Sequence, residues 1–335
     1  MILVITLLSE INFMNKPKIG IIGIGMVGSP LKKYFEERGF KRGFDIFYRD
    51  ADSKKGFNDN IHEADIVFVC VPTPKKRDGS CDIKIVDSVV KKFHNQKKVI
   101  VVKSTIEPGT VARLQKKYNC PILFNPEFLT ESRAWEDFIK PDRQIIGHTE
   151  KSLGNSSFVL GILPQAYFSS PGVLGTYDFI RLTSSEAEMG KYAGNIFGAM
   201  KVTYANILAD FCRVLEKVLG KEGINQKVDY NNVRKVIAHD SRIGDGWLDV
   251  SYGDYRGFGG YCFPKDMAAF IAFGRKTEKK LKKNDPDKKL LKSALRFLES
   301  IWNYNKELLK SQGLTIEWVS SHDRELAEKL KNNKK

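Results

Sequence analysis

Residues 18–28 read KIGIIGIGMVG, a short apolar run that passes into the glycine pattern GxGxxG, and a helix-like stretch then continues to Glu37. In such a strand–turn–helix unit the first glycine makes the turn. The second lets a pyrophosphate approach the backbone, and the third allows the helix to pack closely on the strand. The amino terminus of the helix then faces the phosphates. The stretch predicts a dinucleotide-binding unit at the start of a doubly wound sheet.

An acidic residue lies at the distance that this unit requires. A second apolar strand is expected over 44–48 and leads to Asp50, 22 positions beyond Gly28. A carboxylate at that place binds the ribose hydroxyls of adenosine and favours NAD over NADP. Asp52 is a second candidate for the ribose, and Arg49 could instead accommodate a 2′-phosphate. We predict NAD as the cofactor.

Three further apolar runs, 64–71, 98–103 and 121–124, have the composition of parallel strands that are buried on both faces. The carboxyl ends of such strands border the ligand crevice. Two carboxylates, Glu127 and Glu131, follow the last run and are candidates for acid–base work or for ordinary helix capping. The residues expected to contact the cofactor are Gly23, Gly25, Met26, Val27, Gly28, Asp50, Pro72, Thr73, Ser104 and Thr105.

One long amphipathic helix without proline is expected from Ser185 to about Gly220. Lys191 and Asn195 stand four residues apart in it and therefore share a face. A cation beside an amide suits the stabilisation of a developing oxyanion, although a surface lysine with a chance neighbour would give the same spacing. A second helix is expected from about Tyr230 to Asp240.

The segment GFGGYCFPKD at 257–266 combines a glycine-rich turn with a helix start, since Pro264 fits a first helical turn. Cys262 would lie at the amino terminus of that helix, beside Lys265. Both features are expected to lower the pKa of the thiol from its ordinary value of about 8.5. Asp266 follows one turn later, where it could act on a proton or a water. The alternative is a buried structural cysteine in a glycine-rich turn.

Composition limits the class of protein. The chain has 335 residues, a formal net charge of +15 and five cysteines without a CxxC pair. Its length suits two domains, and its cysteines indicate a reducing, cytoplasmic compartment with neither a disulfide framework nor a zinc site. The positive charge suggests anionic partners such as phosphorylated substrates. The basic stretches carry no interleaved aromatic residues, so nucleic acid is not expected.

We expect four segments along the chain. Residues 1–14 form a leader, which is too short for a membrane span and a poor signal peptide. An NAD-binding Rossmann domain follows over 15–185, and a central helical domain with the cysteine loop over 186–275. A basic linker and one helix fill 276–335. The predicted apolar face of that helix comprises Leu291, Leu295, Leu298, Ile301, Trp302 and Leu308.

Taken together, these segments resemble the UDP-glucose/GDP-mannose dehydrogenase family. The resemblance spans roughly residues 18–274. It is carried by GIGMVG at 23–28, VPTPKKRDGSCD at 71–82, KSTIEPGT at 103–110, NPEFLTESRA at 125–134, KYAGN at 191–195, RIG at 242–244 and GFGGYCFPKD at 257–266.

The resemblance implies an NAD-dependent oxidation of the C6 alcohol of a nucleotide sugar to a carboxylate, carried out by a homodimer. UDP-glucose is the first expected substrate, and GDP-mannose and UDP-N-acetylhexosamines remain open. Cys262 would form a thiohemiacetal and then a thioester. Glu131 would act with a water, and Lys191 and Asn195 would stabilise the oxyanion. Asp266 would work with the lysine and an ordered water, and Thr105 would lie near the nicotinamide and the reacting centre. The implied substrate contacts are Glu127, Phe128, Leu129, Lys191, Asn195, Arg242 of the partner subunit, Phe258, Gly259 and Lys265.

Two departures from the family leave other functions open. No strand–helix alternation follows the PKD segment, so we expect the family's third domain to be absent. In addition, Ser132 replaces a common glycine, and Tyr255-Arg256-Gly257 replaces a proline–glycine turn. A two-electron β-hydroxyacid dehydrogenase, which would need neither Cys262 nor Glu131, and a non-catalytic dinucleotide-binding relative are the alternatives.

Overall fold

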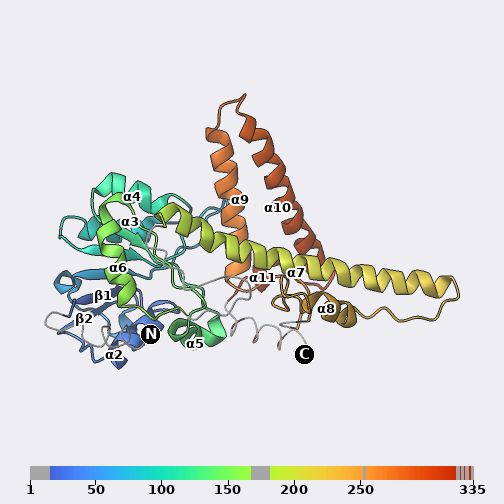
Figure 1. Ribbon diagram of the computed structural model, residues 1–335, viewed down its shortest axis with the longest axis horizontal. Coiled ribbons are helices and arrows are strands. Elements are labelled where there is room, and N and C mark those ends of the chain that lie inside the picture. Colours follow the sequence, from blue (N-terminus) through green and yellow to red (C-terminus); the bar gives the residue numbers. More distant parts are fainter. Residues whose placement is uncertain are drawn as a thin grey trace, which may run out of the picture.

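A computed structural model describes residues 16–166, 182–251 and 254–321, together with the isolated positions 325, 328 and 332. The predicted leader at 1–14 lies outside the described residues. The chain forms an α/β unit at one end and a helical unit at the other, joined by one long helix (Figure 1). The predicted fold class is therefore confirmed.

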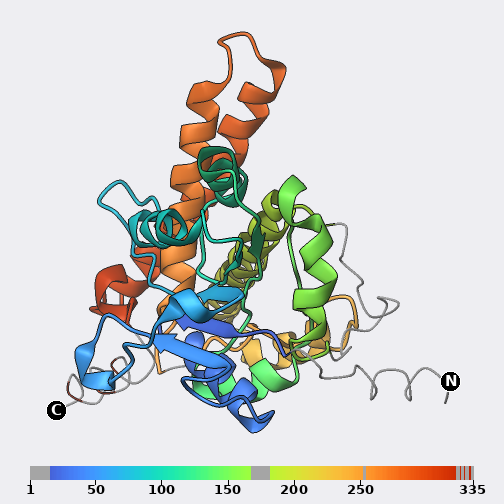
Figure 2. The ribbon, with the colours of Figure 1, turned by 90° about the vertical axis from the view of Figure 1, so that its left-hand side faces the viewer.

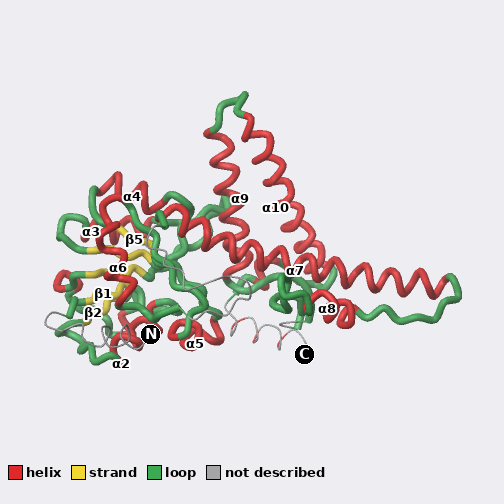
Figure 3. The backbone as a smooth tube through the Cα atoms, in the orientation of Figure 1, coloured by secondary structure: helices red, strands yellow, loops and turns green. Residues whose placement is uncertain are grey.

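The α/β unit is built on a five-stranded parallel sheet with strand order β2-β1-β3-β4-β5. The order reverses direction between β1 and β3, and in open α/β sheets ligands bind at such a switch point, beyond the carboxyl ends of the strands. Figure 3 shows the strands side by side at this end of the molecule. Their bounds are β1 Ile19–Ile22, β2 Ile46–Arg49, β3 Ile66–Val69, β4 Val99–Val102 and β5 Ile122–Phe124.

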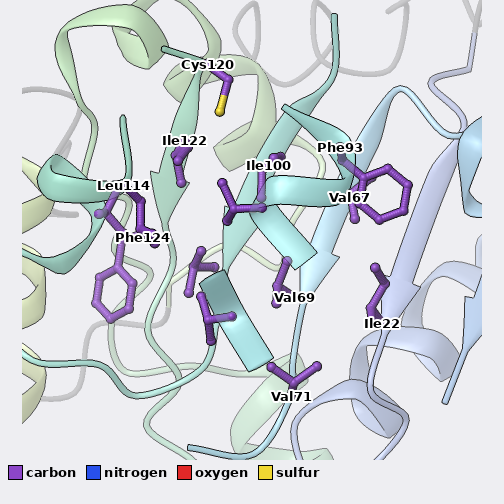
Figure 4. Packing of buried hydrophobic residues seen from close by; sticks show 14 of the residues in the cluster. Ile22, Val67, Val69, Val71, Phe93, Ile100, Leu114, Cys120, Ile122 and Phe124 are labelled. Atoms are coloured by element: carbon purple, nitrogen blue, oxygen red, sulfur yellow. The ribbon is translucent and has the colours of Figure 1, made fainter. Parts of the chain in front are cut away.

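Helices cover both faces of the sheet, which explains why the strands are apolar throughout. Helices α3 (Lys84–Phe93), α4 (Thr110–Tyr118) and the start of α7 pack against one face, and Figure 4 shows part of this core. Helices α2 (Gly28–Glu37), α5 (Ala134–Ile139) and α6 (Leu153–Gly161) cover the other face. Short 3₁₀ turns complete the unit: η2 Ser53–Lys55, η3 Ile61–Glu63, η4 Glu131–Arg133 and η5 Glu150–Ser152.

Helix α7 (Ser184–Lys221) organises the second unit. It has 38 residues, and at 1.5 Å per residue it is about 57 Å long. The side chain of Thr183 caps its first turn together with Glu186, as the sequence pattern T-x-x-E predicts. The predicted long helix is confirmed to within one residue at each end.

Three more helices and one short turn of helix pack along α7: α8 (Tyr230–Ala238), α9 (Cys262–Lys280), α10 (Pro286–Lys310) and α11 (Ile316–Val319). Helices α9 and α10 form an antiparallel pair that rises from the middle of α7, and α8 lies near its far half (Figures 1 and 2). One core joins α7, α9, α10 and α11. A second core joins the far half of α7 to α8.

The last segment differs from its predicted organisation. The lysine-rich stretch that was expected to be a linker continues α9 as far as Lys280, and only residues 281–285 connect it to α10. Glu278 forms ion pairs with Lys288 and Lys292 across the pair of helices. These ion pairs link α9 and α10, which also share apolar core residues. Within α10, the predicted apolar residues Leu295, Ile301 and Leu308 are buried.

A buried carboxylate ties the two units together. Glu188 in the first turns of α7 is fully buried and accepts backbone N–H groups from Gly109, Thr110 and Val111, at the start of α4. Since these N–H groups have no partner inside α4, the Glu188 oxygens satisfy them at the positive end of the helix dipole. Burial outweighs these hydrogen bonds and raises the pKa of Glu188 to about 7. No helix in the described parts of the chain is both long and apolar enough to cross a membrane.

Candidate active site

A cleft of about 890 Å³ opens at the carboxyl ends of β1, β2, β3 and β4. Its walls come from both units, because Tyr261, Cys262 and Lys265 of the helical unit face the glycine-rich turn. Twelve of the predicted site residues line it: Gly23, Gly25, Met26, Val27, Asp50, Pro72, Thr73, Ser104, Thr105, Glu127, Cys262 and Lys265. The cofactor residues and the cysteine therefore share one cavity.

The three glycines of the turn have three different roles. Gly23 has φ of +93°, and a Cβ there would lie 2.6 Å from the carbonyl oxygen of Cys70. A Cβ on Gly28 would overlap the carbonyl oxygen of Gly23, so this glycine allows the helix to approach the strand. Gly25 lines the cleft, and its missing Cβ would meet nothing within 4 Å. That open space beside the start of α2 fits the pyrophosphate of a dinucleotide.

Asp50 lies at the end of β2 and has an ordered carboxylate. One oxygen accepts N–H from Ile24 at 2.6 Å, and the other accepts N–H from Asp52 at 2.9 Å. Lys55 pairs with Asp50 at 3.1 Å. Partial burial opposes ionisation, but these hydrogen bonds outweigh it and lower the pKa of Asp50. An ionised carboxylate at this edge of the cleft fits the ribose hydroxyls of NAD, and Asp52 and Arg49 line the same edge.

Two predicted hydroxyls hold the loops together. Thr73 donates to the carbonyl of Thr105 at 2.7 Å, and Ser104 donates to the carbonyl of Val71 at 2.7 Å. These bonds join the loops after β3 and β4. Both hydroxyl protons are therefore committed to the protein, and only the hydroxyl oxygens of Thr73 and Ser104 remain as acceptors toward the cleft.

Cys262 is the first residue of α9, as predicted, but its electrostatic environment is not the predicted one. Burial raises the pKa of the thiol to about 11, whereas we expected it to be lowered. Burial is the main cause, and Lys265 offsets it little because it pairs with Asp266 at 2.6 Å. Asp266 is itself 1% exposed and also accepts a hydrogen bond from the Asn195 amide.

Lys191 and Glu127 form the other buried pair at this end of the cleft. The ammonium group donates to the carboxylate of Glu127 at 3.0 Å and to its backbone carbonyl at 2.6 Å. The second carboxylate oxygen accepts N–H from Leu129 at 2.7 Å. Burial opposes ionisation of Glu127, but Lys191 and Leu129 outweigh it and lower the pKa. The Lys191 ammonium also lies 5.2 Å from the centre of the Phe128 ring.

Ten predicted site residues are not among those that line the cleft: Gly28, Phe128, Leu129, Glu131, Lys191, Asn195, Arg242, Phe258, Gly259 and Asp266. Glu131 begins η4 and is not among the residues that line it. Arg242 is highly exposed and pairs with Asp240 at 2.7 Å. Phe258 is 1% exposed and packs in the core of the helical unit against Trp302, so its side chain cannot reach a ligand. The prediction that Phe258 contacts the substrate therefore fails for its side chain.

The structure adds two lysines that the sequence analysis did not select. Lys103, at the end of β4, lines the cleft, is 3% exposed and donates to the Asn125 side-chain oxygen. Burial lowers the pKa of Lys103 to about 8. Lys55 donates to the carbonyl of Ile24 at 2.9 Å as well as to Asp50. The position of Lys103 at a strand end was a usable signal, whereas the fold alone brings Lys55 to the turn.

Among the residues that the structure describes, no group of three His, Cys, Asp or Glu side chains could hold a metal ion. The parallel sheet, the glycine turn and the ionised Asp50 instead fit NAD. A cysteine and two buried lysine–carboxylate pairs lie at the other end of the same cleft. These features define a two-unit NAD-binding protein of the dehydrogenase type.

Comparison with known proteins agrees with this class. Residues 50–159 match the NAD binding domain model of the UDP-glucose/GDP-mannose dehydrogenase family, and residues 185–285 match its central domain model. The chain belongs to this family. The match to the first model begins at Asp50, so the glycine turn at 23–28 is assigned from geometry.

Two curated relatives and one solved structure illustrate the similarity. UDP-glucose 6-dehydrogenase of Rickettsia conorii is 34% identical over 64% of this chain and 45% of its own. The Pseudomonas aeruginosa enzyme of that name is 33% identical, over 64% and 45%. A UDP-glucose dehydrogenase structure from Pyrobaculum islandicum aligns with a TM-score of 0.65 at 26% identity, over 90% of this chain and 72% of that one. The chain thus spans about half the length of these curated relatives.

Proposed function

We propose that this chain catalyses the NAD-dependent, four-electron oxidation of a nucleotide sugar, with Cys262 as the nucleophile. The observation that carries the proposal is that Cys262 lines the same cleft as the dinucleotide residues. UDP-glucose is the first expected substrate, because the curated relatives above are named for it. GDP-mannose and UDP-N-acetylhexosamines are the other candidates.

NAD⁺, when bound, supplies the hydride acceptor, and two molecules are required for each sugar. The overall balance is RCH₂OH + 2 NAD⁺ + H₂O → RCOO⁻ + 2 NADH + 3 H⁺. Gly25 and Asp50 would hold the pyrophosphate and the ribose, respectively. The chain must then remove a proton from the alcohol, stabilise an oxyanion, and supply a thiol and a water.

The buried pairs suit the first two tasks. Asp266 accepts hydrogen bonds from Asn195 and Lys265 and would hold the water that takes the alcohol proton. The Lys191 ammonium and the Asn195 amide are donors fixed by buried carboxylates, so they need not reorganise when negative charge develops on the sugar oxygen.

Cys262 would act once an aldehyde is present. A carbon–sulfur bond forms as the thiol proton moves to the aldehyde oxygen, which gives a thiohemiacetal. Loss of hydride and a proton from this adduct gives a thioester, and water then releases the acid and regenerates the thiol. Glu131 is the proposed base for that water by its match to the family. Glu127 lies in the cleft wall and is the second candidate.

We also propose a homodimer formed along α7. Phe197, Tyr204, Phe211 and Val218 are spaced by seven residues on this helix and are 59%, 54%, 70% and 44% exposed. Seven-residue spacing places them along one stripe, which a second copy of the helix could cover. Arg242 lies outside the cleft of its own chain, and we propose that it serves the partner's site.

We also propose a reducing, cytoplasmic location, on the evidence of the cysteines. All five cysteines are free, and the closed cores of the two units are complete without a disulfide bond. The expected product, a nucleotide-sugar acid, would suit polysaccharide biosynthesis.

The test is a count of NADH formed per sugar consumed, over a panel of UDP-glucose, GDP-mannose and UDP-N-acetylhexosamines. A ratio of two for one member of the panel supports the proposal. A ratio of one would indicate a two-electron dehydrogenase. NAD⁺ binding by calorimetry with no NADH from any member would indicate a non-catalytic relative.

A further inference from the structure

The backbone of the loop before Cys262 is held by the carboxyl-terminal helices rather than by a neighbouring strand. Gln312 binds both backbone groups of Arg256: it accepts the N–H at 2.8 Å and donates to the carbonyl at 3.0 Å. Asn305 does the same for Phe258, at 2.8 and 2.9 Å. Gly260 donates its N–H to the carbonyl of Val319 at 2.9 Å. Every second residue from 256 to 260 is therefore bound to this part of the chain.

Asn305 is the buried member of this set. It lies on α10, is 1% exposed, and pairs with Phe258 as a peptide group would in a sheet. Gly257 makes room for it, since φ there is +101° and a Cβ would lie 2.6 Å from the Asn305 side-chain oxygen. A buried amide fully paired in this way is costly to replace, because its loss leaves both Phe258 groups without a partner.

The start of the loop is fixed from a second side. The Arg256 guanidinium donates to the Asn206 side chain at 3.0 Å and to Asp210 at 2.9 Å, both on α7. Tyr304 of α10 donates to the other oxygen of Asp210 at 2.9 Å. The loop thus begins at a junction of α7 and α10 and ends where α9 starts.

The loop residues between these bound positions are Gly257 and Gly259. Within the described residues, neither glycine makes a backbone hydrogen bond to α10 or α11. Gly259 cannot carry a side chain, because a Cβ there would overlap the Tyr255 hydroxyl and lie 2.9 Å from Val319. The loop is therefore packed tightly on its α10–α11 side.

We infer that Asn305 is a positioning residue, which holds the glycine loop so that Cys262 stays sheltered at the end of the cleft and the loop keeps the shape that the sugar nucleotide meets. The part of the inference that concerns the sugar nucleotide rests on the proposed function. The part that concerns the shelter of Cys262 does not. It assigns to α10 and α11 a role in the site that goes beyond filling a core.

The experiment compares Asn305→Leu, which keeps the shape and removes both hydrogen bonds, with Asn303→Leu on the exposed face of the same helix. Iodoacetamide labelling of Cys262, followed by peptide mass spectrometry, reports the loop directly. Loss of two buried hydrogen bonds predicts labelling roughly tenfold faster, and a KM for the sugar nucleotide roughly tenfold higher. The dissociation constant for NAD⁺ should change less than about twofold. Asn305→Asp keeps an acceptor for the Phe258 N–H but loses the donor to its carbonyl, so its labelling rate and KM should be intermediate.

A core residue without this role would give a different result: Asn305→Leu would melt at a lower temperature, yet Cys262 labelling and KM would stay at wild-type values. That outcome overturns the inference. If Asn305→Leu does not fold, the exposed Gln312→Leu decides, with labelling about threefold faster expected and unchanged labelling contradicting the inference. Should the wild-type protein give no NADH, the proposed function fails, while the labelling arm still tests Asn305.

Discussion

Replacing Asp266 with Asn should make Cys262 more reactive while it makes the protein a poorer catalyst. Burial, followed by the carboxylates of Asp266 and Glu127, raises the pKa of the thiol, and Lys191 and Lys265 oppose this. Asp266 acts twice, since its own charge repels a thiolate and its ion pair with Lys265 offsets the charge of that lysine. The amide of Asn keeps the shape and a hydrogen-bond acceptor but removes the charge.

The magnitude follows from the pKa of about 11. At pH 8 that value leaves about one thiol in a thousand ionised, against roughly one in five for an unperturbed cysteine. If Asp266→Asn lowers the pKa of Cys262 by about one unit, the ionised fraction and hence the rate of alkylation at pH 8 rise about tenfold. Turnover should fall at least tenfold, because the water and the Asn195 amide lose their carboxylate.

The assay measures iodoacetamide labelling of the Cys262 peptide between pH 7 and 10. For the wild type the rate should rise about tenfold per pH unit throughout, since deprotonation is incomplete over the whole window. The Asp266→Asn curve should lie above it and level off earlier. Lys265→Met, which removes a cation, should lie below it. If Asp266→Asn labels no faster than the wild type, burial alone sets the pKa and the electrostatic reasoning is wrong.

Three further predictions test the fold, the domain junction and the dimer. Gly25→Val should leave the melting temperature unchanged but weaken NAD⁺ binding, measured by calorimetry, at least tenfold. Gly28→Ala should lower the melting temperature, because a Cβ meets backbone at Gly28 but not at Gly25. The same effect of both variants on melting temperature and NAD⁺ affinity would contradict these two roles. Glu188→Gln should cost about 1–3 kcal/mol of unfolding free energy in urea at pH 8, above the pKa of about 7, because one of the two oxygens that accept the three N–H groups becomes an NH₂ donor. A change below about 0.5 kcal/mol would refute this. Phe211→Asp should convert a dimer to a monomer in sedimentation, and a wild-type monomer at micromolar concentration would remove the basis of that proposal.

Much of the fold and the cofactor end of the cleft could be predicted because local pattern determines them. The spacing of Gly23, Gly25 and Gly28 between a strand and a helix specifies a turn, and the distance to Asp50 specifies the second strand. The long helix from Ser184 to Lys221 follows from an uninterrupted helical period and a capping box at its start.

Burial and pairing over long distances in the chain could not be predicted in this way. The sequence places Lys265 beside Cys262, but it does not show that Asp266 neutralises that lysine or that the thiol is buried, so the direction of the pKa was wrong. Glu188 meets its partners across about 78 positions. The lysines after residue 275 look like a linker because exposed helical faces and loops share the same composition.

The most direct test of the central claim is the fate of Cys262→Ser, compared with Cys120→Ser, which removes a buried thiol distant from the cleft. A serine keeps the shape, but an alkoxide forms far less readily than a thiolate, so the second oxidation should stop. Cys262→Ser should bind NAD⁺ with nearly wild-type affinity, and likewise UDP-glucose or whichever sugar of the panel the wild type oxidises. Its net turnover should fall by several orders of magnitude, whereas Cys120→Ser should keep wild-type turnover. Consumption of two NAD⁺ per sugar by Cys262→Ser at a rate near that of the wild type would show that Cys262 is structural and contradict the account.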